Sequence, residues 1–164
     1  VGLSWMDHEF GTSALSEGVI GWDWFGLQLE DGTALMLGWL RNADGTSGSI
    51  FHGTISYADG RIRSVSPSEF SVETVERWSS PASGITYPSG WDIESIDLNV
   101  YLEIRPLIPN QELSNSYTYW EGAVSVEAKI DGIRMKGRGY AELTGYDDES
   151  VLTWPHSSSQ PVMN

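Results

Sequence analysis

Four Asp-Gly pairs, each placed between segments rich in β-branched, aromatic or aliphatic residues, constrain this chain more than any other feature. They are Asp31-Gly32, Asp44-Gly45, Asp59-Gly60 and Asp131-Gly132. Asp-Gly supplies the positive backbone φ angles that tight hairpin turns require, so each pair predicts a reversal between two antiparallel strands. A chain built from such hairpins, without a sustained helical period, predicts an all-β barrel or sandwich.

The segments between these turns predict about eight or nine strands. Their approximate ranges are 20–30, 33–41, 48–58, 61–65, 68–79, 90–105 with a break near Ser95, 117–130 and 133–145. The polar, proline-bearing stretch 106–116 is expected to be a loop. We therefore expect one closed or nearly closed antiparallel β-barrel domain over residues 1–150, followed by a C-terminal tail over residues 151–164 that frays.

The composition narrows the functional classes. With 9 Lys and Arg against 23 Asp and Glu, the 164-residue chain carries a net charge of −14. Such a field repels nucleic acid and anionic lipid surfaces, so no nucleic-acid partner is expected. No segment is long and apolar enough to predict a transmembrane span. The absence of cysteine excludes disulfides and thiol catalysis and leaves the cellular compartment open.

The hairpin at Asp131-Gly132 separates its two faces cleanly if its turn has two residues. Ile130 then lies opposite Ile133, and the pairing runs outward from there. One face is apolar throughout, from Trp120 along to Leu143, whereas the other is polar. This split indicates that one face packs inward and that the other faces water or a polar site.

Two charged pairs fall opposite each other on the polar face of that hairpin. Glu127 lies opposite Lys136, a favourable pair, and Glu121 lies opposite Glu142. Two facing glutamates require a bridging cation such as Arg138, a proton held by one of them, or enough solvent for both ionised groups to tolerate each other.

The same rule at Asp31-Gly32 places Glu30 opposite Thr33. One face then carries Trp22, Trp24, Gly26, Gln28, Leu35, Leu37, Trp39 and Arg41, and the other carries Asp23, Phe25, Leu27, Leu29, Ala34, Met36, Gly38 and Leu40. Because both faces are largely apolar, both are expected to be covered. The barrel core would cover one, and another domain, another subunit or a ligand would cover the other.

This register predicts an aromatic cluster and a perturbed carboxyl group. Trp22, Trp24 and Trp39 would share a face, with Arg41 near enough for a cation–π contact. Asp23 would lie in apolar surroundings, which raise the pKa of a carboxyl group unless it finds a donor. The alternative is that Asp23 ends a strand and accepts hydrogen bonds from backbone amides.

The densest group of ionisable residues is Asp7, His8 and Glu9 near the amino terminus. In an extended segment Asp7 and Glu9 point one way and His8 the other. The remaining histidines have no motif spacing to His8, so no metal site is expected. No serine lies in a nucleophile elbow, so a Ser-His-Asp triad has no support. Acid–base chemistry by Asp7 or His8 is the better functional hypothesis.

Several motifs along the chain resemble a known family in their order and spacing. They are Trp5 to Gly11, Gly21 to Phe25 with Leu27-Gln28-Leu29, Tyr87-Pro88 with Trp91, Tyr119 to Val124, Gly137 to Tyr140, and Glu142 to Tyr146. Together they resemble the carboxy-terminal half of AttH-like proteins, the lipocalin-like family related to carotenoid 1,2-hydratase. The resemblance covers roughly residues 2–146.

The resemblance implies a lipocalin-like antiparallel β-barrel that pairs with a second such domain, with the ligand site at or between the two. A chain that starts at Val1 and resembles only the second half is expected to be a processed product or a fragment. One departure concerns Gly38-Trp39, where relatives carry a tyrosine and a basic residue. The small Gly38 is expected to open space beside Asp23.

The implied activity is that of a lyase-type hydratase, or a related cyclising enzyme, acting on a hydrophobic polyene or terpenoid without a cofactor. Protonating an alkene carbon requires an acid held protonated in a dry pocket, with aromatic faces to stabilise the cation. Asp23 or Asp7 would be the acid, and His8, Glu9 or Tyr119 would orient the water molecule.

The residues expected to contact the ligand are Trp5, Trp22, Trp24, Trp39, Tyr119, Trp120 and Glu121. Two alternatives need no acid. In the first, the chain is a non-enzymatic module that binds a hydrophobic small molecule. In the second, it is a structural half whose partner is an N-terminal lipocalin-like domain or another copy in a homo-oligomer.

Overall fold

In the computed structural model the described residues form one sheet of ten strands, all of them paired antiparallel. The structure describes residues 6, 18–43, 47–114 and 118–147. The strands are β1 (Val19–Leu29), β2 (Ala34–Asn42), β3 (Ser47–Ser56), β4 (Ile62–Val65), β5 (Ser71–Ser79), β6 (Thr86–Ser95), β7 (Val100–Pro106), β8 (Glu112–Ser114), β9 (Thr118–Ile130) and β10 (Ile133–Thr144). A 3-10 turn, η1 (Pro67–Glu69), joins β4 to β5. The predicted all-β class is confirmed.

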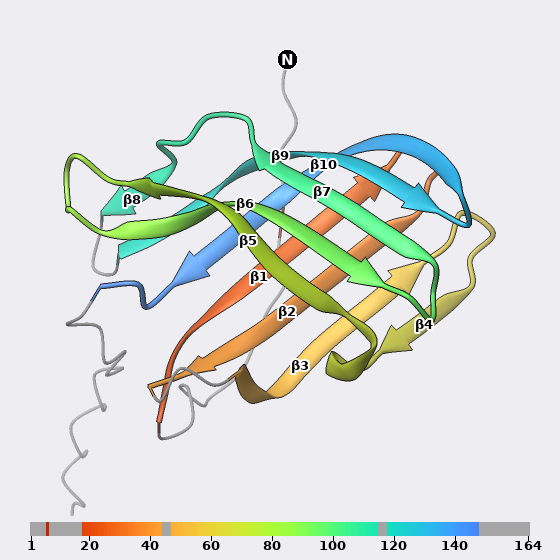
Figure 1. Cartoon of the computed structure of the whole chain (residues 1–164), viewed down its shortest axis with the longest axis horizontal. Helices are drawn as coiled ribbons and strands as arrows, with labels where there is room; N and C mark the ends of the chain where they lie inside the picture. Colours follow the sequence, from red (N-terminus) through yellow and green to blue (C-terminus); the bar gives the residue numbers. More distant parts are fainter. Residues whose placement is uncertain (1–5, 7–17, 44–46, 115–117, 148–164) are drawn as a thin grey trace, which may run out of the picture.

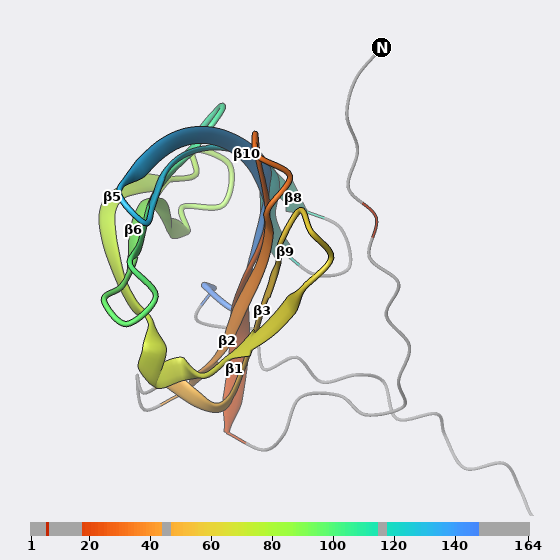
Figure 2. The same ribbon diagram turned by 90° about the vertical axis from the view of Figure 1, so that its right-hand side faces the viewer.

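The strands are hydrogen-bonded in the order β4-β3-β2-β1-β10-β9-β7-β6-β5, and β8 pairs with β9 beside that path. The pairing of β1 with β10 places the two ends of the strand sequence at the middle of the sheet. Figures 1 and 2 show the sheet curling around its own inner face. Because β4 and β5 are the ends of the hydrogen-bonded path, the predicted barrel is open between these two edges.

Two strand boundaries differ from those predicted. The stretch 106–116, expected to be a loop, contains β8, whose Glu112 pairs with Trp120. Strand β6 begins at Thr86 rather than near residue 90. Pro88 is accommodated there because β6 pairs only with β5 before Trp91, so its missing N–H breaks no second ladder. The predicted break near Ser95 is confirmed as the turn between β6 and β7.

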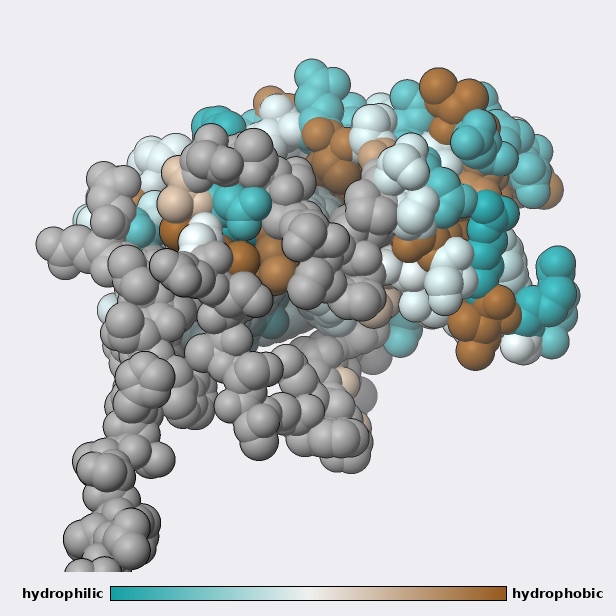
Figure 3. All heavy atoms as spheres, turned by 90° about the horizontal axis from the view of Figure 1, so that it is seen from below, coloured by the Kyte–Doolittle hydropathy of each residue, from teal (hydrophilic) through white to brown (hydrophobic). Residues whose placement is uncertain are grey.

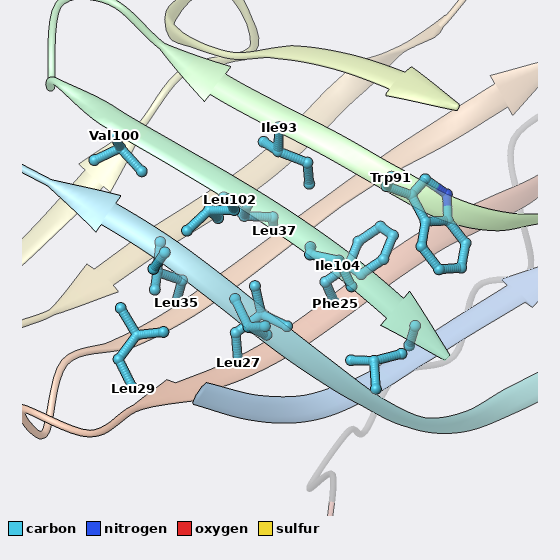
Figure 4. Close-up of a cluster of buried hydrophobic side chains, with 14 of the residues drawn as sticks. Phe25, Leu27, Leu29, Leu35, Leu37, Trp91, Ile93, Val100, Leu102 and Ile104 are labelled. Atoms are coloured by element: carbon cyan, nitrogen blue, oxygen red, sulfur yellow. The ribbon is translucent and has the colours of Figure 1, made fainter. Parts of the chain in front are cut away.

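The core lies on the concave inner face, where inward-facing residues of β1, β2, β6, β7 and β9 supply most of the buried side chains (Figure 4). Its fully buried side chains include Phe25, Leu27, Leu35, Leu37, Trp91, Ile93, Leu102, Ile104, Trp120, Val124 and Leu143. Burial of these aliphatic and aromatic groups is the main term that stabilises such a sheet.

The β9–β10 hairpin has the register predicted for it. Ile130 pairs with Ile133 and Glu121 with Glu142. Its apolar face is the inner one and its charged face is the outer one.

The β1–β2 register predicted from Asp31-Gly32 is wrong by one residue. Gln28 pairs with Ala34, so the loop has three residues. The Asp31 carboxylate accepts hydrogen bonds from the Thr33 backbone N–H at 2.8 Å and from Thr33 Oγ1 at 3.0 Å. Leu29 N in turn donates to Thr33 O at 2.8 Å, which closes the longer loop.

A one-residue slip moves every side chain of β2 to the opposite face. The inner face therefore carries Asp23, Phe25, Leu27, Leu29, Leu35, Leu37, Trp39 and Arg41. Trp22 and Trp24 lie on the outer face, so the predicted three-tryptophan cluster does not form. The outer face keeps an apolar character, because Met36 and Leu40 are half-buried beside them.

The described part of the face seen from below is mixed in hydropathy (Figure 3). In the view from below, apolar side chains lie scattered among hydrophilic ones (Figure 3). Within the described ranges, no helix is long and apolar enough to cross a membrane.

Candidate functional site

Asp23 is the only charged side chain that is buried among the described residues, with 4% of its surface exposed. It lies on the inner face of β1, opposite Trp39 of β2 and Leu143 of β10. Arg41 Nε donates to Asp23 Oδ1 at 3.2 Å. The Tyr146 hydroxyl group contacts both carboxylate oxygens, at 3.0 and 2.9 Å. The predicted alternative, in which backbone amides satisfy Asp23, is thus replaced by side-chain donors.

Burial is the largest influence on Asp23 and raises its pKa from 3.8 to about 6. The positive charge of Arg41 and hydrogen bonds from Tyr146, Arg41 and Trp39 lower the pKa without cancelling the effect of burial. The pKa of Asp23 is therefore raised even though the carboxyl group has donors, whereas the sequence predicts a raised pKa only for a carboxyl group without them. A pKa near the working pH is the property that a proton donor or acceptor requires.

Arg41 is fixed in place by three contacts. Besides Asp23, its guanidinium donates to the backbone carbonyl of Thr144 and lies over the Tyr146 ring, 3.7 Å from the centroid. A side chain at Gly21 would collide with both Thr144 O and Arg41. The cation–π contact predicted for Arg41 thus involves Tyr146 rather than the tryptophans.

Tyr146 reaches Asp23 because the chain turns sharply after β10. Gly145 has a φ of +65°, and a Cβ there would collide with the carbonyl of Ile20. Burial and the neighbouring carboxylate raise the pKa of Tyr146 far above its ordinary value, so its hydroxyl group stays protonated. It remains a donor to Asp23 at any physiological pH.

Aromatic rings extend from this charged pair along the inner face. Phe25 stacks on Trp39 at 5.4 Å between centroids and meets Trp91 edge-on at 5.0 Å. Trp91 contacts Trp120 at 6.1 Å. On the other side of Asp23, Tyr146 packs against Tyr87 at 5.5 Å, and Tyr87 stacks on Trp78 at 6.3 Å. We call Phe25, Trp39, Trp91, Trp120, Tyr87, Tyr146 and Trp78 the aromatic interior.

Glu112 of β8 holds the loop between β5 and β6 at the end of this interior. It accepts hydrogen bonds from Ser80 Oγ at 2.8 Å and Ser83 Oγ at 2.6 Å. Burial raises the pKa of Glu112, but hydrogen bonds from Ser83 and Ser80 and the proximity of the Tyr87 hydroxyl group outweigh this effect, so the net pKa is lowered. Glu112 is therefore ionised near neutral pH and stabilises the loop rather than supplying protons.

The structure separates the predicted ligand-binding residues into two groups. Trp39 and Trp120 belong to the aromatic interior, together with Asp23. The others lie half-buried on the outer face, namely Trp22, Trp24, Tyr119 and Glu121. On that face Trp22 Nε1 donates to Glu142 Oε1 at 3.1 Å, and the Trp22 ring lies 6.2 Å from the Tyr119 ring.

The two facing glutamates of the outer face meet neutral donors. Tyr140 OH contacts Glu121 Oε1 at 3.4 Å, and Trp22 contacts Glu142. No ion pair with Arg138, the cation proposed as their bridge, occurs among the described residues.

The predicted residues Trp5, Asp7, His8 and Glu9 lie outside the described residues, and their roles stay predictions. Within the described ranges no group of three or more His, Asp or Glu residues could hold a metal ion.

Sequence reasoning gave no site role to Arg41, Tyr146, Tyr87 or Trp91. Arg41 was assigned to the wrong face because of the register error, and Thr33, two residues after Asp31, was the signal that could have corrected it. Tyr146 lies 123 residues from Asp23, and no local pattern brings the two together. Tyr87 and Trp91 fall on alternate positions of one strand, which would have marked them as inward-facing.

A separate surface groove of about 490 Å³ lies near the turn end of the β9–β10 hairpin. Its lining contains both cations and carboxylates, including Lys129, Arg134, Lys136, Glu103 and Glu127. This mixed charge does not suit an apolar ligand, so the groove adds nothing to the interior site.

A family profile and two solved structures are similar to this chain. The profile of the family described as AttH-like matches residues 1–146. A crystal structure described as an AttH protein from Nitrosomonas europaea is 32% identical, with a TM-score of 0.74, covering 82% of this chain and 42% of that one. Kievitone hydratase from Nectria haematococca has a TM-score of 0.66 at 17% identity, covering 82% of this chain and 41% of that one.

The second similarity confirms the fold class, a lipocalin-like β-barrel, and at 17% identity it shows the fold alone. The chain spans about two fifths of the length of both solved structures. No curated protein sequence matches the chain significantly.

Proposed function

Because this chain belongs to the AttH-like family, we propose that it takes part in the acid-catalysed hydration or cyclisation of a hydrophobic polyene or terpenoid, with Asp23 as the proton donor. One observation carries the proposal. The only buried charged side chain of the described residues has its pKa raised to about 6 and lies within a continuous lining of aromatic rings.

The hydration step balances with these groups and one water molecule. The Asp23 carboxyl group gives its proton to an alkene carbon, so that a C–H bond forms as the π bond breaks. The resulting tertiary cation is stabilised by the faces of Trp39 and Phe25. Water then forms a C–O bond and returns one proton to the carboxylate, so the sum is alkene plus water to alcohol. In cyclisation a second alkene takes the place of water, and loss of a proton regenerates the acid.

The charge state of Asp23 fits this role. With a pKa of about 6, about one molecule in ten carries the proton at pH 7. An apolar ligand that excludes water from the carboxyl group would raise this fraction further. Arg41 and Tyr146 orient the group and keep the ionised form tolerable between turnovers.

The remaining predicted roles are part of the same proposal. His8 and Glu9 would orient water, and Asp7 is the alternative acid. The outer-face residues Trp22 and Trp24 would contact a ligand or a partner domain from the opposite side of the sheet. A chain of about two fifths the length of its relatives is expected to need such a partner, either an N-terminal lipocalin-like domain or a second copy.

The decisive experiment compares Asp23→Asn with Asp92→Asn, using lycopene-like and terpenoid alkenes and following the gain of one water by mass spectrometry. Asp92 is a matched control because it is also held by an arginine, Arg105 at 3.0 Å, but lies half-exposed on the outer face. We expect Asp23→Asn to lower the rate by at least about 100-fold and Asp92→Asn to leave it within about threefold. Activity that survives both Asp7→Asn and Asp23→Asn would disprove the assignment.

A second candidate is a non-enzymatic module that binds a hydrophobic molecule. It is favoured by the observation that both Asp23 oxygens already accept hydrogen bonds, as in a structural ion pair. It predicts that apolar ligands quench tryptophan fluorescence, that no alcohol forms, and that Asp23→Asn changes stability but not ligand affinity.

A further inference from the structure

Two hydrogen-bond donors in the aromatic interior lack an acceptor among the described residues. They are Trp91 Nε1 and the Tyr87 hydroxyl group, and each side chain is 1% exposed. Both project from the inner face of β6, four residues apart. A buried donor that has lost its contact with water and gained no acceptor destabilises the folded protein, so native structures rarely keep one without a function.

The neighbouring tryptophan and tyrosine donors do have acceptors. Loose packing of this region therefore does not explain why Trp91 Nε1 and the Tyr87 hydroxyl group have none. Trp120, in contact with Trp91, donates from its Nε1 to Pro109 O at 2.8 Å. Tyr146, in contact with Tyr87, donates to Asp23. Glu112 lies near Tyr87 and helps to raise its pKa, but the two groups do not meet in hydrogen-bond geometry, and both carboxylate oxygens already accept from Ser80 and Ser83.

The two donors lie on either side of Asp23. From Trp91 the ring contacts run through Phe25 to Trp39, which pairs with Asp23. From Tyr87 a single ring, that of Tyr146, leads to the carboxylate. Figure 4 shows Trp91 beside Phe25 at one end of the buried cluster. An oxygen atom held at either donor would leave the apolar part of the same molecule to extend toward Asp23.

We propose that the ligand of the aromatic interior carries an oxygen acceptor, as a hydroxyl or carbonyl group on its terpenoid or polyene skeleton, and that Trp91 Nε1 and Tyr87 OH donate to it. The inference rests on the proposed function only in placing the ligand in the aromatic interior. A pure hydrocarbon would leave both donors unsatisfied in the complex. A site built to hydrogen-bond an oxygen rejects an analogue of the same shape that lacks it.

The test measures the affinity of the 164-residue chain for farnesol and for β-farnesene, a matched alcohol and hydrocarbon, by quenching of tryptophan fluorescence. We expect the alcohol to bind at least about tenfold more tightly, equivalent to one good hydrogen bond. Tyr87→Phe and Trp91→Phe should each bring the affinity ratio closer to one. Trp120→Phe removes the same ring volume and a bonded N–H, so it should weaken both ligands and keep the ratio.

A ratio near one in the unmodified chain would overturn the proposal, as would a ratio that neither Tyr87→Phe nor Trp91→Phe changes. Failure of both ligands to bind would overturn it as well. Because binding needs no turnover, a preserved preference for the alcohol without any hydrated product would disprove the proposed function and leave this inference standing.

Ligand-free stability gives a second, independent measurement. Removing an unbonded hydroxyl group should leave the thermal midpoint of Tyr87→Phe unchanged or raise it. Trp91→Phe should lower the midpoint by less than Trp120→Phe does, because only the latter strands an acceptor, Pro109 O. A clear drop for Tyr87→Phe, or equal drops for the two tryptophan variants, would show that these donors are bonded and would overturn the proposal.

Discussion

The hairpins β1–β2 and β9–β10 both reverse at an Asp-Gly pair, yet they fold differently. Asp131 adopts a positive φ of 50° beside Gly132 at 82°, which gives the two-residue turn. Gly32 also has a positive φ, 87°, but Asp31 does not. The Asp31 carboxylate accepts hydrogen bonds from Thr33 instead, and the loop has three residues rather than two.

The difference decides which side of the sheet receives charge. In β9–β10 the lysines and arginines point outward and the inner face is apolar. In β1–β2 the longer loop turns Trp39 and Arg41 inward beside Asp23. The three-residue loop with its Asp31–Thr33 hydrogen bonds thus accompanies a register that forms a buried ion pair about 20 Å farther along the strands, at roughly 3.3 Å per residue.

The largest effect is expected from shortening the β1–β2 hairpin by one strand residue. Deleting Thr33 would place Ala34 opposite Leu29 and so turn Leu35, Leu37 and Trp39 out of the core. We expect no cooperative unfolding transition by circular dichroism. The control, Asp131→Asn, keeps a two-residue Asn-Gly turn in β9–β10 and should shift the free energy of unfolding by less than about 0.5 kcal/mol. A cooperative, native-like shortened variant would contradict the importance of the loop.

The next largest effect is expected from Arg41→Ala. Removing one partner of a buried pair leaves Asp23 without its counter-charge, which should cost about 3 to 4 kcal/mol at pH 8 in urea denaturation. Lys136→Ala, on the outer face of β9–β10, should cost less than about 0.5 kcal/mol. Equal effects would mean that the inner and outer charges contribute alike.

The free energy of unfolding should also depend on pH because of Asp23, by an amount comparable to the effect of Arg41→Ala. The pKa of Asp23 is about 6 in the folded chain against 3.8 ordinarily, so the folded state binds the proton more tightly. Stability attributable to Asp23 is thus present below about pH 4 and falls by about 3 kcal/mol as pH rises through 6. The difference between the unfolding free energies of the unmodified chain and Asp23→Asn, measured from pH 4 to 7, should follow this fall. A flat difference would mean that Asp23 titrates normally.

The smallest effect tests the turns themselves. Asp31→Gly removes both hydrogen bonds to Thr33 and should cost about 1 kcal/mol. Asp131→Gly relieves a left-handed non-glycine residue and should stay within about 0.5 kcal/mol of the unmodified chain. Thermal or urea unfolding of the pair measures the contrast, and a larger loss for Asp131→Gly would reverse our explanation of the two registers.

Most of the fold was predictable because its signals are local. Alternation along each strand gave the inner face of β9–β10 from Trp120 to Leu143, and the turn at Asp131 set its register. The β1–β2 register was predictable in principle from Asp31 and Thr33, which are two residues apart at the loop. Strand β8 was not, because a segment of only three residues, Glu112 to Ser114, forms a strand only when β9 offers it an edge.

By itself the sequence determined an all-β chain, the family to which it belongs, and a carboxyl group at Asp23 whose pKa burial would raise. Only the tertiary structure decided what surrounds that group. Arg41 and Tyr146 come from β2 and from beyond β10, 18 and 123 residues from Asp23. A desolvated carboxylate takes its donors from the strands and connections that the sheet brings beside it. Which ones these are depends on the strand order and register of the whole sheet.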